Sequence, residues 1–176
     1  DPLKLIYEYG ADATRFGIAY QIMGNQDIRF SADSIVMGKK FCNKVWNASR
    51  FVLSKIPNSH PLRDLPQGDK ITNADKRIFK KLDQTIRSVN SDLEKFKFGK
   101  AAHTLYDFFW HDFCDKYIEE SKKQDNENTR KILSYVLSAS LRLLHPFIPF
   151  ITEEIYQQLP IKNKKQCLMI ENWPKP

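Results

Sequence analysis

Residues 39–53, KKFCNKVWNASRFVL, separate into two chemically different sides when they are placed at about 100° per residue, as in an α-helix. One arc carries cationic and amide side chains, namely Lys39, Lys40, Asn43, Asn47 and Arg50. The opposite side carries Phe41, Cys42, Val45, Ala48, Val52 and Leu53, and Trp46 and Phe51 lie at its two borders. The stretch therefore predicts an amphipathic helix that buries one side in a core.

The nitrogen-rich side of this helix has two interpretations. Cationic and amide donors beside an aromatic ring can hold phosphates and stack bases. A side of Lys, Arg and Asn can equally be a solvated surface that binds nothing. Trp46 shares this ambiguity, since a border tryptophan can stack on a base or pack against a neighbouring helix. The pattern alone leaves both interpretations open.

The rest of the chain predicts further helices and almost no strand. Apolar spacing marks them, together with Pro2 in the first turn of the first helix, Gly10 as its stop, and Thr72 or Asn73 as the cap of the helix that starts at residue 74. We expect helices over residues 2–9, 12–22, 31–55, 74–97, 98–122, 128–144 and 152–158. The segment 98–122 is so apolar that it should lie centrally, so the chain is predicted to be an all-α helical bundle. Residues 57–68 should form a surface loop, residues 161–176 a strand or a docked tail, and Glu153 and Glu154 should complement the dipole of the last helix.

Composition and charge narrow the class of protein. A chain of 176 residues with 41% hydrophobic residues suits one domain with a genuine core. It contains no apolar run near the roughly 20 residues that a membrane span needs. The net charge of +7 favours a polyanion such as RNA. The three cysteines, Cys42, Cys114 and Cys167, are odd in number and lack CxxC spacing, which favours reduced, packed thiols in a cytoplasmic protein.

No catalytic or metal-binding motif is present. The chain lacks the Gly-rich phosphate-binding loops, and its four histidines do not have a metal-ligand spacing. Cys114 lies near Asp115 and His111, but its place on the apolar side favours a packed thiol over a nucleophile. His145 before Pro146 is interpreted as a packed, hydrogen-bonded histidine. We therefore predict no catalytic residue and no metal ligand.

Three segments together resemble one family. Residues 39–53 resemble the helix that opens the anticodon-binding domain of valyl-tRNA synthetases. Residues 9–19, YGADATRFGIA, are similar to the segment that follows the catalytic domain of class I synthetases. Residues 144–159, LHPFIPFITEEIYQQL, are similar to an element late in the anticodon-binding domain. The segments occur in the family's order and roughly at its spacing, whereas residues 57–73 and 162–167 match little.

The resemblance implies a domain division and a function. Residues 1–30 would be connecting helices after the catalytic domain, residues 31–160 the helical bundle of the class I synthetase anticodon-binding type, and residues 161–176 a C-terminal extension. The domain would recognise the anticodon of tRNA(Val) in a valine--tRNA ligase, a cytoplasmic monomer that uses ATP and magnesium. The HIGH and KMSKS signatures are missing and Asp1-Pro2 opens the chain without a methionine. We therefore expect a piece of a ligase that needs no cofactor itself and whose partners include the catalytic and editing domains of the parent chain.

The resemblance also implies a set of tRNA-binding residues. These are Lys39, Lys40, Lys44 and Arg50 on phosphates, Asn43 and Asn47 on base edges or ribose hydroxyls, and Trp46 stacked on an anticodon base. The sequence departs from the family at Lys39-Lys40, where Arg-Asn is common, and at Tyr156, where Trp is usual. The first change replaces a planar, bidentate guanidinium by an ammonium group. Contact with a phosphate is therefore kept better than recognition of a planar partner.

Three alternatives remain at this point. The first is the equivalent domain of an isoleucyl-tRNA synthetase. The second is a helical protein–protein adapter with an incidental basic face. The third is an independent hydrolase, which would need a cluster of ionisable residues that the sequence does not reveal.

Overall fold

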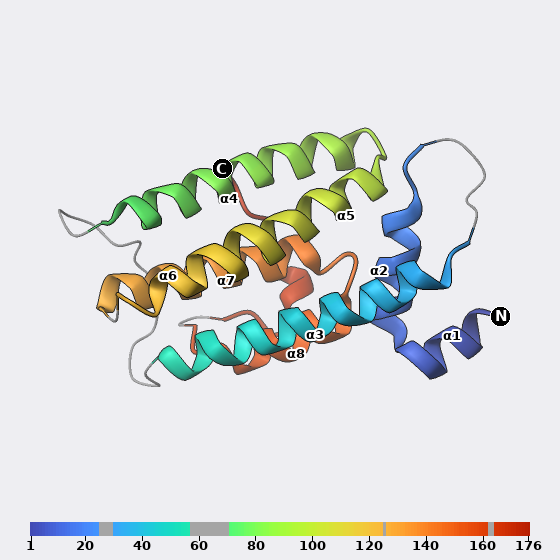
Figure 1. The fold of residues 1–176 in the computed structure, drawn as a ribbon, viewed down its shortest axis with the longest axis horizontal. Coiled ribbons are helices and arrows are strands. Elements are labelled where there is room, and N and C mark those ends of the chain that lie inside the picture. The colour runs from blue at the N-terminus through green and yellow to red at the C-terminus, as the bar shows by residue number, and fades with distance from the viewer. Residues whose placement is uncertain (25–29, 57–70, 125, 162–163) are drawn as a thin grey trace.

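The computed structural model describes residues 1–24, 30–56, 71–124, 126–161 and 164–176 (Figure 1). Its α-helices are α1 (Pro2–Tyr9), α2 (Ala11–Gln21), α3 (Ala32–Lys55), α4 (Asn73–Glu94), α5 (Phe98–Asp107), α6 (Glu119–Ser121), α7 (Glu127–Leu144) and α8 (Pro149–Gln158). A π-helical segment, η1 (Phe108–Ile118), joins α5 to α6, and a 3₁₀ turn, η2 (Leu168–Ile170), lies near the C-terminus. Within these residues there is no strand, so the predicted all-α bundle is confirmed. The predicted loop over residues 57–68 lies outside the described residues.

The bundle places one long helical rod between two others. In Figure 1, α4 and α3 run along opposite sides of the continuous α5–η1–α6 rod, and η1 contacts both. Helix α7 packs on α3 and α4, and α8 packs on α3 and α7. Helices α2 and α3 approach closely because Gly17 and Gly38 have no side chains. A Cβ atom on Gly17 would lie 2.6 Å from the carbonyl oxygen of Ser34, and one on Gly38 would overlap the carbonyl oxygen of Ala13.

Local chemistry sets the ends of α4. At its start, the backbone N–H of Asp75 donates to Thr72 Oγ1 at 3.3 Å and the backbone N–H of Thr72 donates to Asp75 Oδ2 at 2.9 Å, which forms a capping box. At its end, Phe96 has a φ of 56°, in the left-handed region that bulky residues rarely adopt. The helix therefore stops at Glu94, short of the predicted Lys97.

The central rod differs from the prediction of one regular α-helix over residues 98–122. Its middle 11 residues are π-helical, with i→i+5 hydrogen bonding. The wider turn lets a row of large rings face the core, and Phe109, Phe113 and Tyr117 are at most 2% exposed. Apolar periodicity predicted the buried side, but it did not distinguish the two hydrogen-bonding patterns.

Helix α8 begins at Pro149, three residues before the predicted start at Thr152. Glu153 and Glu154 consequently lie outside its first turn, so the prediction that they complement its dipole is wrong. Asp12 of α2 takes that role. Its carboxylate accepts the backbone N–H of Phe150 at 3.2 Å and that of Ile151 at 2.7 Å. A negative charge at a helix N-terminus is stabilised by these unpaired donors and by the helix dipole.

The C-terminal residues form a docked tail. Trp173 Nε1 donates to Asn90 Oδ1 at 2.7 Å on α4, and the backbone N–H of Leu168 donates to Glu153 Oε2 at 2.8 Å on α8. Glu171 Oε1 accepts the hydroxyl of Tyr156 at 2.5 Å. The tail is thus held by α4 and α8 together. The division at residues 1–30, 31–160 and 161–176 stays a prediction.

Candidate nucleic-acid interface

Helix α3 has the two sides that its sequence predicts. Phe41, Val45 and Val52 are 0% exposed and belong to the core. The side chains on the opposite face are solvent-exposed, namely Lys39, Lys40, Asn43, Asn47 and Arg50. We call these five residues the amide–cation face. Its members recur at i, i+3 and i+4, so they lie in a row of neighbours along the helix.

Most of the amide–cation face is available to a ligand. Among the described residues, no side-chain hydrogen bond or ion pair involves Lys40, Asn43, Asn47 or Arg50. Lys39 is an exception, because its Nζ lies 3.4 Å from the backbone oxygen of Glu8 and 5.7 Å from the Tyr9 ring centroid. The part of the face nearest the C-terminal end of α3 is therefore the least committed to the protein itself.

Lys44 lies beside this face but is engaged. Its Nζ donates to Asp115 Oδ1 at 2.8 Å and lies 5.1 Å from the Trp110 ring centroid. The hydrogen bond from Lys44 to Asp115 raises the pKa of Lys44, despite partial burial, so the ammonium is held in its charged form. Because Asp115 already offsets this charge, Lys44 offers less to a phosphate than Lys40 or Arg50 does.

The aromatic ring next to Arg50 is Phe51, at the other border of α3 from Trp46. Trp46 is half-buried and packs against the hydrophobic core. Phe51 is also half-buried, and the Nζ atoms of Lys55 and Lys122 lie 5.9 and 5.6 Å from its ring centroid. The sequence placed Phe51 at the border of the face. It did not bring Lys122 there, because the two residues are far apart in the chain and meet only where α6 ends beside α3.

Cys42, Cys114 and His145 are buried or partly buried and have the surroundings of structural residues, not of catalytic ones. Burial raises the pKa of Cys42 and of Cys114 to about 12, which keeps both thiols protonated and unreactive at neutral pH. His145 Nδ1 lies 2.8 Å from Thr152 Oγ1, and burial lowers the pKa of this imidazole. In the part of the chain that the structure describes, no group of three or more His, Cys, Asp and Glu residues could hold a metal ion.

Comparison with known proteins agrees with this geometry. A family model described as the anticodon-binding domain of tRNA ligase matches residues 75–176. Valine--tRNA ligase of Thermotoga maritima is 44% identical over 178 aligned residues, and that of Bacillus thuringiensis subsp. konkukian is 41% identical over 181. Each alignment covers 99% of this chain and 20% of the relative. The chain thus spans about one fifth of the length of the relatives it matches.

Two solved structures share the fold. One is the ternary complex of Agrobacterium radiobacter K84 agnB2 LeuRS with tRNA and LeuAMS, with a TM-score of 0.81 and 23% identity over 99% of this chain and 20% of that one. The other is the free form of Mycobacterium tuberculosis methionyl-tRNA synthetase, with a TM-score of 0.70 and 19% identity over 88% of this chain and 34% of that one. At these identities the likeness concerns the fold alone. The family model, which spans more than half of the sequence, shows that the chain belongs to the family of anticodon-binding domains of tRNA ligases.

Proposed function

We propose that this chain recognises the anticodon arm of tRNA(Val) as part of a valine--tRNA ligase. The observation that carries the proposal is the amide–cation face of α3, which is exposed along its length while the opposite side is buried in the core. The sequence identity of 41–44% to valine--tRNA ligases supports the choice of tRNA(Val) over tRNA(Ile).

The spacing of the face suits several nucleotides. Lys39 and Arg50 are 11 positions apart, which corresponds to about 16 Å along the helix axis at the usual rise. In our proposal Lys40 and Arg50 hold phosphates, and Asn43 and Asn47 donate to and accept from base edges or ribose hydroxyls. Phe51 is the ring best placed to contact a base beside Arg50, and stacking on Trp46 stays a second prediction.

The reaction belongs to the remainder of the ligase. We expect the full-length enzyme to use ATP and magnesium. The sequence has no nucleotide-binding loop, and the described residues contain no carboxylate cluster that could hold a cation. We therefore infer that the catalytic and editing domains of the parent chain supply that chemistry, and that this chain binds and orients tRNA for them. We further propose that the ligase is a cytoplasmic monomer. No helix among the described residues is long and apolar enough to span a membrane.

Substitution of Arg50 tests the proposal. Arg50→Ala should weaken binding of a tRNA(Val) transcript by about 1–2 kcal/mol and make the dependence of affinity on salt shallower, because one phosphate contact is lost. The matched control is Arg87→Ala, which removes an exposed arginine from α4 at a distance from α3. An affinity of Arg50→Ala equal to that of the unaltered chain would exclude Arg50 from the interface.

Two titrations separate the alternatives. Competition between tRNA(Val) and tRNA(Ile) transcripts distinguishes a valyl from an isoleucyl domain. Binding of tRNA that is no tighter than binding of an equally charged inert polymer, at two salt concentrations, would instead support a protein–protein adapter and refute the proposal.

A further inference from the structure

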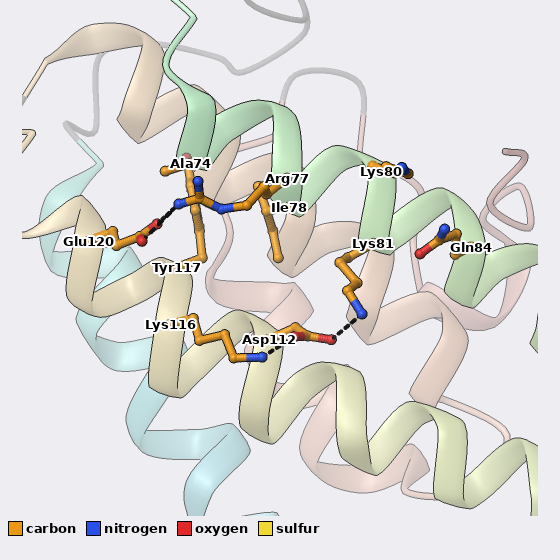
Figure 2. Close-up of a pocket in the computed structure, with 10 residues that line it drawn as sticks. All are labelled: Ala74, Arg77, Ile78, Lys80, Lys81, Gln84, Asp112, Lys116, Tyr117 and Glu120. Carbon is orange, nitrogen blue, oxygen red and sulfur yellow. Dashed lines mark hydrogen bonds and ion pairs between the residues drawn. The ribbon is translucent and has the colours of Figure 1, made fainter.

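A second positively charged feature lies on the other side of the central rod. It is a hollow of about 420 Å³ between α4 and η1, which we call the α4–η1 hollow (Figure 2). Its floor is apolar and buried, formed by Ala74, Ile78 and the ring of Tyr117. Its rim carries Arg77, Lys80, Lys81, Gln84, Asp112, Lys116 and Glu120. An apolar floor with charged groups converging on its edge is the usual form of a ligand site.

The walls of the hollow are held in place by a buried hydrogen bond. The hydroxyl of Tyr117 on η1 donates to Asp75 Oδ1 at 2.7 Å, and Asp75 is the same residue that completes the capping box at the start of α4. The start of α4 is therefore fixed to η1. The wall on the η1 side is π-helical. This conformation is rare in proteins, and where it occurs it often lies at a functional site. The hollow is thus preformed.

The charges on the rim do not balance. Four cations, Arg77, Lys80, Lys81 and Lys116, face two carboxylates, which leaves an excess of two positive charges (4 − 2 = 2). Both carboxylates are already paired. Glu120 accepts from Arg77 at 2.9 and 3.0 Å, and Asp112 lies 2.7 Å from the Nζ of Lys116 and 3.6 Å from that of Lys81.

Lys80 and Lys81 keep hydrogen-bonding capacity for a ligand. Figure 2 shows Lys81 and Lys116 reaching Asp112 from opposite walls of the hollow. The 3.6 Å separation of Lys81 from Asp112 is too long for a hydrogen bond, so the three donors of its ammonium stay available. Lys80 has no ion pair with any described residue. The uncompensated charge therefore lies mainly on the α4 side.

An RNA strand that lies on α3 and crosses η1 and α6 toward this hollow meets only paired carboxylates on those two elements. Neighbouring helix axes are about 8–10 Å apart, so α4 lies about 16–20 Å from α3 across η1. The carboxylates of the intervening η1 and α6 are Asp112, Asp115, Glu119 and Glu120, and each has a lysine or arginine partner. Their pairing removes most of the repulsion that a phosphate chain would otherwise feel there.

The geometry points to the α4–η1 hollow as a second RNA contact, in which a phosphate of the RNA strand lies against Lys81 and Lys80. The inference rests on the proposed function, because it takes RNA as the partner. An RNA strand matches the uncompensated positive charge of the rim, since each of its nucleotides carries an anionic phosphate. The site would thus extend the RNA interface from α3 across η1 to α4.

Lys81→Ala tests the inference, with Lys76→Ala as the matched control. Both lysines are exposed on α4, but Lys76 does not line the hollow. With a tRNA(Val) transcript as the probe, Lys81→Ala should lower affinity about fivefold to tenfold and reduce the slope of log K against log salt by about 0.7–0.9, whereas Lys76→Ala should change affinity less than about twofold. Circular dichroism of each variant verifies that the helices are intact.

A chemical footprint shows whether the contact is local. Acetylation of the unaltered chain, followed by mass spectrometry, should find Lys80 and Lys81 protected by the transcript and Lys76 still reactive. Equal behaviour of the two variants, or equal protection of all three lysines, would overturn the inference while leaving the proposed function intact. Protection of Lys80 and Lys81 by polyglutamate as strong as that by RNA would also overturn it in favour of an acidic polypeptide. Failure of the unaltered chain to bind the transcript would refute the proposed function, and this inference with it.

Discussion

Replacing Tyr117 by Phe removes one buried oxygen and leaves the ring in place. The hydroxyl of Tyr117, which is 2% exposed, donates to Asp75 Oδ1 at 2.7 Å, and Asp75 is 1% exposed. Burial and the hydrogen bond to Asp75 raise the pKa of Tyr117, so the phenol stays protonated and remains the donor at any ordinary pH. In the variant, Asp75 Oδ1 loses its donor in a place that water does not reach.

The expected loss of stability follows from that unsatisfied oxygen. A hydrogen bond to a charged group contributes about 1.5–3 kcal/mol, and a buried acceptor left without a partner costs at least as much. We expect Tyr117→Phe to lower the free energy of unfolding by about 2–3 kcal/mol. With an m-value of about 2–3 kcal/mol/M in urea, the midpoint should fall by about 1 M. The melting temperature should fall by about 5–10 °C for a chain of this size.

The control removes the same atom from the surface. Tyr135 is 36% exposed, and its hydroxyl has no hydrogen bond to another described residue, so Tyr135→Phe should change stability by less than about 0.5 kcal/mol. Urea unfolding followed by circular dichroism measures both variants. A loss below about 0.5 kcal/mol for Tyr117→Phe, with an unchanged m-value, would refute the conclusion that this bond fixes α4 to η1.

Three further predictions concern packing and titration. Gly38→Ala should destabilise the chain by about 1–3 kcal/mol in urea unfolding, because its Cβ would collide with the backbone of α2, and the roughly 1 kcal/mol gain in helix propensity does not offset this. A thiol reagent at pH 8 should modify Cys167 before Cys42 and Cys114, whose pKa values burial raises to about 12, and all three only after unfolding; equal rates in the folded chain would contradict this. Burial, opposed by two backbone hydrogen bonds, raises the pKa of Asp12, so the folded state keeps this proton to a higher pH than the unfolded state does. The contribution of Asp12 to the free energy of unfolding should therefore decline as the pH rises from the pKa that Asp12 has in the unfolded state through the higher pKa that it has in the folded state. Asp12→Asn should remove that decline, and parallel pH profiles of the two proteins would show the assignment to be mistaken.

The sequence predicted the helices well where the information is local. The proline of α1, Gly10 after it and the capping threonine of α4 are signals within a few residues of each helix end, and all three act as predicted. The start of α8 was misplaced because two prolines close together allow more than one helix start. The choice of Pro149 depends on Asp12, whose carboxylate caps the helix from α2, more than 130 residues away in the chain.

The same distinction applies to the interface. Helical periodicity alone placed Asn43, Asn47 and Arg50 on the exposed side of α3, because burial of the opposite side leaves them no other position. The state of Lys44 could not be predicted in this way, since its partner Asp115 lies on another helix and its charge is offset only after the bundle has formed.

The lysines show most clearly where sequence reasoning ends. In the sequence Lys80 and Lys81 add only diffuse positive charge, and nothing in the neighbours of these two residues or of Lys122 marks them as recognition residues. Folding sets Lys122 over Phe51 and sets Lys81 on the rim of an apolar hollow with too few carboxylates around it. A cation becomes a recognition element through the geometry and the charge balance of its surroundings, both of which are tertiary properties. The variant Lys81→Ala and the acetylation of Lys80 and Lys81 therefore measure what the lysines of the hollow contribute to RNA binding, separately from the contribution of Arg50.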